Sequence, residues 1–109
     1  MNLIVKLVTA PAPLLTVTPD DEGVPLGGST TLTWMRDTTG ANFEFSSTSI
    51  SGLTNPCFSA PSYNSSNNTV SVTDSHAGAS SQGSFNYTLS VASGGTAYHA
   101  GGNPVIVNR

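Results

Sequence analysis

Alternation of apolar and polar residues is the feature of this chain that most restricts its fold. From residue 85 to residue 91 every second side chain is apolar. Successive side chains of a β-strand point to opposite faces, so this pattern predicts a strand with one buried face. The residues of that face are Phe85, Tyr87, Leu89 and Val91. No segment shows the apolar period of about 3.6 residues that an amphipathic helix of ordinary length requires, and the chain is predicted to be nearly all β.

Six further segments are predicted as strands. The segment 30–34 alternates in the same way and directs Leu32 and Trp34 toward the core. The others are 2–8, 14–18, 42–46 with Phe43 and Phe45 inward, 69–73 with Val70 and Val72 inward, and 105–108. The first and last segments are apolar on both faces, which is typical of central strands or of a sheet junction.

Turn-forming residues separate these segments. Gly, Pro, Asn and Asp cluster between them, as at 19–23 and 101–104, and they favour tight turns. The polar tract 59–68 is expected to be a surface loop, and the tract 75–82 a mobile one. A chain of 109 residues has room for one core. We therefore predict a single domain over residues 1–109, an antiparallel β-sandwich of about seven strands with immunoglobulin-like architecture.

Low charge excludes several classes of partner. Only 8% of the residues are charged, whereas ordinary domains have about 25%. The cations are Lys6, Arg36 and Arg109, too few to neutralise nucleic-acid phosphates or to bind an anionic membrane. The apolar run at the start is broken by Lys6 and is too short for a signal sequence or a membrane span. We expect a cytoplasmic protein, or a secreted one if a leader has been removed.

The titratable residues show no pattern for a metal or a cofactor. Asp20, Asp21 and Glu22 share one predicted turn without the spacing of a calcium loop, and a solvated turn is expected. His76 and His99 lie in predicted loops, and their spacing from Cys and Asp matches no zinc site. We therefore expect neither metal nor cofactor.

The single cysteine, Cys57, is expected to be a free, buried thiol that behaves as a small hydrophobic residue. Its neighbours predict a turn followed by a strand, with nothing to activate the sulfur, although a histidine could meet it in space. Serines are numerous, but the Gly-x-Ser-x-Gly motif does not occur. Glu44, between two inward phenylalanines, is predicted to point to solvent.

Two tyrosines are candidates for ligand binding. Tyr63 and Tyr98 fall in predicted loops or at strand ends, where an exposed ring can stack on a sugar. Trp34, in contrast, follows the apolar alternation and is predicted to be buried. A carbohydrate-binding module using Tyr63, Tyr98 and loop asparagines is therefore one functional hypothesis.

The end of the chain, 102–109, resembles the C-terminal signature of the small bacterial DP-EP family of β-sandwich proteins. The turn at 16–19, the strand at 28–34 and Thr38-Thr39-Gly40 before Phe43 are similar to that family as well. The resemblance implies an aspartic-peptidase-like activity, in which two carboxylates share a proton. Each protomer of a dimer would supply one of the two carboxylates.

This chain departs from the family at both defining motifs. Asn103-Pro104 stands where the family has Asp-Pro, and Glu22 is separated from Pro25 by two residues where the family has Glu-Pro. Because an asparagine is no acid or base, a catalytic pair would need Asp37 or Asp74.

Three functional hypotheses remain. The preferred one is a non-enzymatic interaction or structural domain for a protein or glycan, because no titratable groups converge and charge is sparse. It is expected to form a homodimer through a low-charge strand edge, such as Val105–Asn108. An aspartic peptidase that uses Asp37 or Asp74 and a carbohydrate-binding module are the alternatives.

Overall fold

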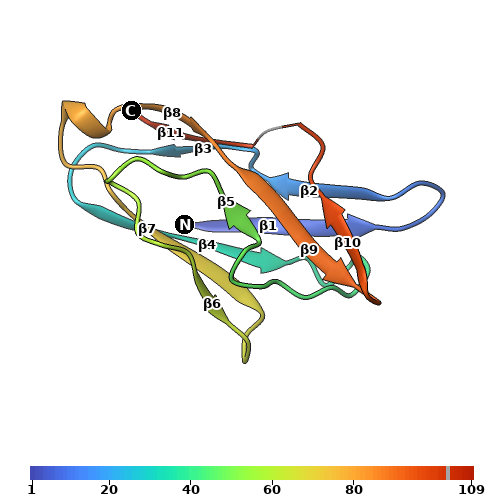
Figure 1. Cartoon of the computed structure of the whole chain (residues 1–109). Coiled ribbons are helices and arrows are strands. Elements are labelled where there is room, and N and C mark those ends of the chain that lie inside the picture. The colour runs from blue at the N-terminus through green and yellow to red at the C-terminus, as the bar shows by residue number, and fades with distance from the viewer. Residues whose placement is uncertain (103) are drawn as a thin grey trace.

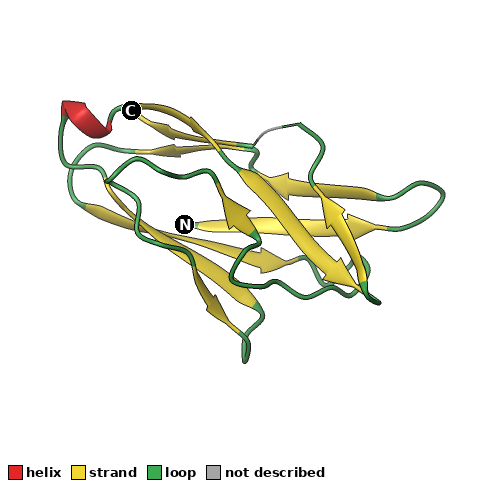
Figure 2. Cartoon of the chain, in the orientation of Figure 1, coloured by secondary structure: helices red, strands yellow, loops and turns green. Residues whose placement is uncertain are grey.

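A computed structural model describes residues 1–102 and 104–109, and strands dominate it, as the sequence predicts (Figures 1 and 2). In these residues there are eleven strands and one 3₁₀ helix, η1 (Ala79–Ser81). The number exceeds the predicted seven because 42–46 forms no strand, 85–91 forms two, and four short strands form outside the predicted segments. Those strands are β3 (Asp21–Val24), β5 (Ile50–Ser51), β6 (Ser62–Asn64) and β10 (Thr96–His99).

The largest sheet has five strands in the order β2-β1-β4-β7-β6. Its other members are β1 (Asn2–Val8), β2 (Leu14–Thr18), β4 (Ser29–Arg36) and β7 (Thr69–Ser75). Every second residue of β1 is buried, as its apolar alternation predicts, and β4 and β7 follow the same rule. One face of this sheet therefore forms one wall of the core.

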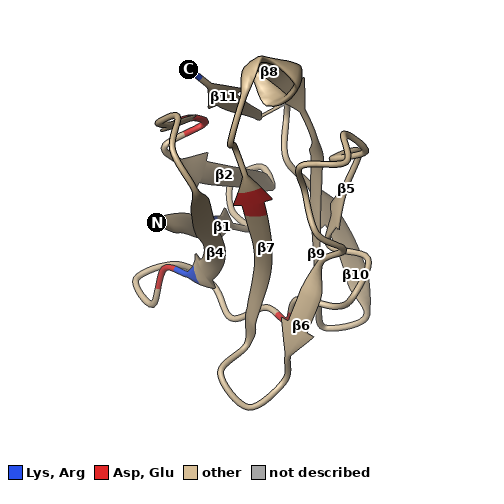
Figure 3. Cartoon of the chain, turned by 90° about the vertical axis from the view of Figure 1, so that its left-hand side faces the viewer, with Lys and Arg blue, Asp and Glu red and all other residues tan. Residues whose placement is uncertain are grey.

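Two three-stranded sheets complete the fold. One has the order β10-β9-β5 and the other β3-β11-β8. Their remaining strands are β8 (Gly83–Asn86), β9 (Thr88–Ser93) and β11 (Val105–Asn108). Viewed along the strands, β4 and β7 form one layer and β5, β9 and β10 lie across the core from them (Figure 3). The molecule is thus a β-sandwich.

Two pairs of strands are parallel, which corrects the wholly antiparallel prediction. β1 pairs in parallel with β4, and β3 pairs in parallel with β11. After the β1–β2 hairpin the chain leaves the first sheet, forms β3 beside β11, and returns as β4 on the other side of β1. Because of this crossover between sheets, β4 runs parallel to β1, and β3 runs parallel to β11, which lies much later in the sequence.

The predicted strand 85–91 is divided between two sheets. β8 pairs with β11, whereas β9 pairs with β10 and β5, and the chain changes sheet at Tyr87. The alternation still holds, since Tyr87 and the inward residues of β9 are buried. Phe85, at the start, is only half-buried and packs edge to face on Phe58, with ring centroids 5.2 Å apart.

Trp34 lies at the centre of the core, with none of its surface exposed. Its indole Nε1 donates a hydrogen bond to the hydroxyl oxygen of Tyr87 at 3.1 Å, and the two rings meet edge to face. The burial predicted for Trp34 is therefore confirmed. Other fully buried side chains include Leu3, Leu7, Leu32, Leu89, Ile106 and Val70.

Segments 42–46 and 59–68 differ from their predictions. The first forms no strand but a single bridge from Glu44 to Ala92, although Phe43 and Phe45 are buried as predicted. Glu44 is exposed, also as predicted. The tract 59–68, predicted as a loop, contains strand β6 paired with β7.

The edge predicted for dimerisation is not available. Val105–Asn108 is strand β11, the central strand of its sheet, with β3 on one side and β8 on the other. This agrees with the prediction that its apolar character marks a central strand, and it corrects the choice of this segment as an edge. Asn103 lies outside the described residues. No helix within the described part of the chain is both long and apolar enough to cross a membrane.

Candidate functional site

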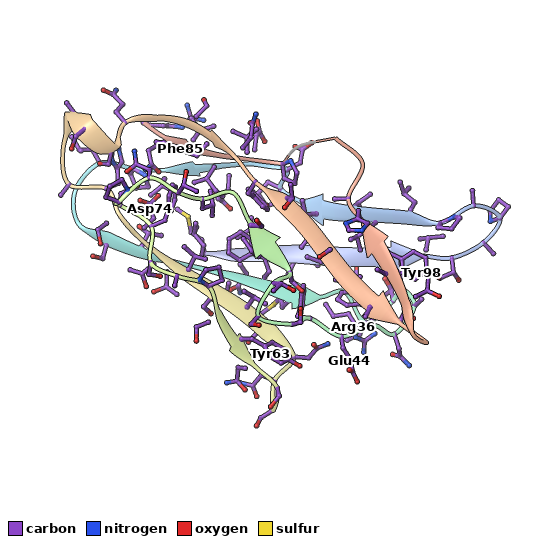
Figure 4. The ribbon with its side chains drawn as sticks, viewed as in Figure 1. Arg36, Glu44, Tyr63, Asp74, Phe85 and Tyr98 are labelled. Carbon is purple, nitrogen blue, oxygen red and sulfur yellow. The ribbon has the colours of Figure 1, made fainter. Side chains whose placement is uncertain are left out.

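A groove of about 870 Å³ lies where β4 ends, beside β6 and the turn between β9 and β10. Polar side chains line most of it, together with the ring of Tyr63. The lining residues are Arg36, Asn42, Phe43, Glu44, Tyr63, Ser65, Asn68 and residues 92–95. Figure 4 shows Arg36, Glu44 and Tyr63 close together at this end of the molecule.

The floor of the groove is the segment around Glu44, which is held against β9. Glu44 N donates to Ala92 O at 2.8 Å, and Ala92 N donates to Glu44 O at 3.1 Å. The hydroxyl of Ser93 adds a bond of 2.7 Å to Asn42 O. These bonds hold the backbone of a segment that is not itself part of a strand. The side chain of Glu44 remains exposed beside the groove.

Asn68 clamps the same segment from the other side. Its Nδ2 donates to Phe43 O at 2.9 Å, and its Oδ1 accepts from Phe45 N at 2.9 Å. Asn68 has a positive φ of 51°, a conformation that asparagine adopts more readily than most residues. Its amide is thus occupied in holding this backbone, and the polar side chains that remain to line the groove are those of Arg36, Glu44 and Tyr63, with Asn42 and Ser65.

The structure separates the two candidate tyrosines. Tyr63 lies in the groove, whereas Tyr98 lies on β10 opposite Val91 and is not among the lining residues. Neither ring is an exposed platform as predicted, because both are half-buried and pack partly against the core. Only Tyr63 therefore remains a candidate for ligand contact.

The two candidate aspartates lie at opposite ends of β4. Asp74 pairs with Thr30 near the start of that strand, and Asp37 follows its last residue. At about 3.3 Å per residue the two positions are about 23 Å apart. One chain therefore cannot bring Asp37 and Asp74 together as a catalytic dyad.

Their surroundings differ as well. Asp37 caps its own turn, with Oδ1 accepting from the hydroxyl of Thr39 at 2.6 Å and from Thr39 N at 2.8 Å. These hydrogen bonds, the hydroxyl bond first, lower the pKa of Asp37. Asp74 has no exposed surface, so it cannot meet a symmetry-related carboxylate at a dimer interface.

Asp74 belongs to a buried polar cluster. Asn108 Nδ2 donates to Asp74 Oδ1 at 3.2 Å and to Ser81 O at 2.8 Å, and it lies 3.7 Å from Cys57 Sγ. His76 adjoins this cluster through the hydroxyl of Ser81, at 2.7 Å. Asp74 Oδ2 and Asn108 Oδ1 have no hydrogen-bond partner among the described residues.

This cluster was not predicted from the sequence, although a signal for it was present. Val70 and Val72 point inward on β7, and the same alternation continues to Asp74 and His76. The strand is two residues longer than predicted, so both polar side chains turn into the core. His76, predicted in a loop, is fully buried.

The remaining titratable residues form no such group. Asp21 and Glu22 belong to β3, not to a turn, and His99 lies exposed on β10. In the described part of the chain, no three His, Cys, Asp or Glu side chains are placed to hold a metal ion.

Cys57 is half-buried at the edge of the polar cluster. Burial raises the pKa of its thiol to about 11, and the neighbouring carboxylate of Asp74 adds to the effect. A thiol held in its protonated form is a poor nucleophile. This agrees with the prediction of an inert cysteine.

We expect Cys57 to react with iodoacetamide at pH 8 about a hundredfold more slowly in the folded protein than in the chain unfolded by urea. The pKa of about 11, against an ordinary 9.0, makes the thiolate scarcer in the folded state. Because the folded thiol binds its proton more tightly, its contribution to stability is present below pH 9 and is lost between pH 9 and 11. Asp74→Asn should accelerate the reaction, and equal rates in both states would contradict this account.

Two comparisons with known proteins found no relative of this chain. No model of a known protein family matches the chain. A search of curated proteins finds no match either. The similarity to the DP-EP family therefore rests on short motifs alone.

Proposed function

We propose that the protein is a non-enzymatic interaction domain, immunoglobulin-like in architecture, that binds a neutral polar ligand in the groove beside Tyr63. The observation that carries the proposal is that a tyrosine ring, one cation and one anion line the same groove. Four neutral polar residues line it as well, together with Phe43, Ala92 and two glycines. Acid chemistry between two protomers has less basis, because Asp74 is fully buried and Asp37 Oδ1 already accepts two hydrogen bonds within its own turn.

A glycan is the ligand class that this chemistry fits. Sugar hydroxyls both donate and accept hydrogen bonds, and Arg36 and Glu44 supply a donor and an acceptor. The ring of Tyr63 supplies an apolar face and a hydroxyl in the same side chain. Charged residues are few and scattered over the view of Figure 3, which favours an uncharged ligand over a polyanion.

A homodimer is part of the proposal. The strands β6 and β8 lie at sheet edges and carry no charged side chain, and an unprotected edge of this kind pairs with another chain. We expect light scattering at high protein concentration to give twice the monomer mass. A monomer under those conditions would remove the dimer from the proposal.

For the groove, we expect binding to a glycan array, and Tyr63→Ala should weaken the strongest interaction at least tenfold because it removes the ring. Loss of a well-packed contact residue at the centre of a site costs about 1.4 kcal/mol or more, which is a tenfold change in affinity. Titration calorimetry with that glycan measures the effect.

Tyr98→Ala is the matched control, because Tyr98 is a half-buried tyrosine outside the groove. It should leave the affinity unchanged. A blank array, or equal losses in the two variants, would refute glycan binding at this site.

A further inference from the structure

A second site lies at the end of β7, away from the groove. His76 follows this strand, and its Nδ1 is 2.7 Å from the hydroxyl oxygen of Ser81 in η1. Its Nε2 is 2.7 Å from the main-chain oxygen of Arg109, just after β11. The end of β7, the nearby helix η1 and the residue after β11 thus form a line of hydrogen bonds: a hydroxyl, an imidazole and a main-chain oxygen.

The Arg109 oxygen determines which nitrogen of the ring can act as a base. A main-chain oxygen only accepts hydrogen bonds, so Nε2 must carry the proton that it donates there. In the neutral imidazole the lone pair is then on Nδ1, which faces Ser81. A nucleophile, a base and a group that orients the base are the arrangement by which proteins activate a serine.

The serine proton has two acceptors within reach. Gly78 O lies 2.9 Å from Ser81 Oγ, and His76 Nδ1 lies 2.7 Å from it. When the proton moves onto Nδ1, the ring becomes a cation that still donates through Nε2. The carboxyl group of Asp74 belongs to the same network through Asn108, whose amide also donates to the main-chain oxygen of Ser81.

Ser81 borders a cleft at the surface. It is 5% exposed and is one of the residues that line this cleft, which has a volume of about 300 Å³. The other lining residues are mostly small: Ser75, Ala77, Gly78 and Ser80, together with Asn55, Pro56 and Cys57. The high pKa of Cys57 keeps that thiol out of the chemistry. Among the serines of the cleft, Ser81 is the one whose hydroxyl is hydrogen-bonded to an imidazole nitrogen in the described residues.

We propose that Ser81 is an acyl-acceptor serine, activated by His76, that takes a small acyl group from an activated ester or thioester. In this step Ser81 Oγ forms a bond to the carbonyl carbon, and the bond from that carbon to the leaving oxygen or sulfur breaks. The serine proton passes to Nδ1 and from there to the leaving group. The product is an acyl-serine, a covalent modification that goes beyond ligand binding in the groove and does not depend on it.

The test is site-resolved acetylation of the whole folded protein by p-nitrophenyl acetate, followed by peptide mapping. We expect an ester on Ser81 that hydroxylamine removes, formed at least tenfold faster than any ester on Ser80. General-base assistance contributes about a hundredfold or more, so His76→Gln should slow acylation of Ser81 by about that factor.

Ser80→Ala is the matched control and should leave acylation of Ser81 unchanged, whereas Ser81→Ala should abolish the ester. If a variant does not fold, the map of the unsubstituted protein decides by itself. No ester at Ser81, or equal labelling of Ser80 and Ser81, would overturn the proposal. Because the glycan assay concerns the groove alone, failure of one test leaves the other intact.

Discussion

Trp34→Ala is expected to reduce the free energy of unfolding by about 3–5 kcal/mol, the usual cost of removing a large buried aromatic side chain. A domain of this size has only about 5–15 kcal/mol in total. Trp34 has no exposed surface, and the cavity left by its loss would adjoin Tyr87, whose ring and hydroxyl both contact the indole. Urea denaturation followed by circular dichroism measures the change.

Tyr87→Phe separates the hydrogen bond from the packing. The ring stays, but the indole N–H of Trp34 loses its acceptor at 3.1 Å, which should cost about 1–3 kcal/mol. Trp34→Phe combined with Tyr87→Phe removes both partners of the hydrogen bond. Tyr87→Phe should therefore cost less stability in the Trp34→Phe background than in the unsubstituted protein. A loss below about 1 kcal/mol for Trp34→Ala would contradict the central place of Trp34 in the core.

Asn108→Leu is expected to destabilise the protein by about 3–5 kcal/mol, because it leaves the buried carboxylate of Asp74 without its amide donor. The main-chain oxygen of Ser81 loses its partner in the same substitution. Both groups are shielded from water, so neither can replace the lost bond with solvent. The measurement is again urea denaturation, at pH 7.

Adding Asp74→Leu to Asn108→Leu should restore much of the lost stability, since an apolar pair leaves neither side chain with an unpaired polar group in the core. Asn67→Leu, on the exposed turn before β7, is the matched control and should change stability by less than about 0.5 kcal/mol. Strictly additive losses in the double variant would show that Asp74 and Asn108 are not coupled.

The long strands could be predicted from the sequence, down to their ends in three cases. β1, β2 and β11 begin and end where the alternation or the apolar run does. In each, the buried residues recur at every second position, which is a local property that neighbouring residues determine. The burial of Trp34 and of Phe43 followed from the same rule.

The short strands and their partners could not be predicted in this way. β3 and β10 have neither an apolar run nor strong alternation, and they form because β11 and β9, which are far more apolar, offer them an edge to pair with. The parallel pairing of β1 with β4 is likewise a property of the whole topology. The change of sheet at Tyr87 leaves the alternation intact, so the sequence gives no sign of it.

The candidate groove was predicted only in part. Tyr63 was predicted as a candidate because it lies in a polar tract. Arg36, Glu44 and Tyr63 belong to three separate segments, and no local sequence pattern shows that these segments line one groove. The buried pair of Ser81 and His76 was missed for a similar reason: a common serine and a histidine in an expected loop carry no signal until β7 turns the imidazole inward.

The pairing of β3 with β11 joins residues near the start of the chain to those at its end. During synthesis β3 emerges long before the strand beside which it lies. Until β11 follows, β3 has no partner in its own sheet, and β8 lacks one as well. Nearly all of the domain must therefore have been made before this third sheet can form, and folding is expected to be slow, as long-range strand pairing generally is.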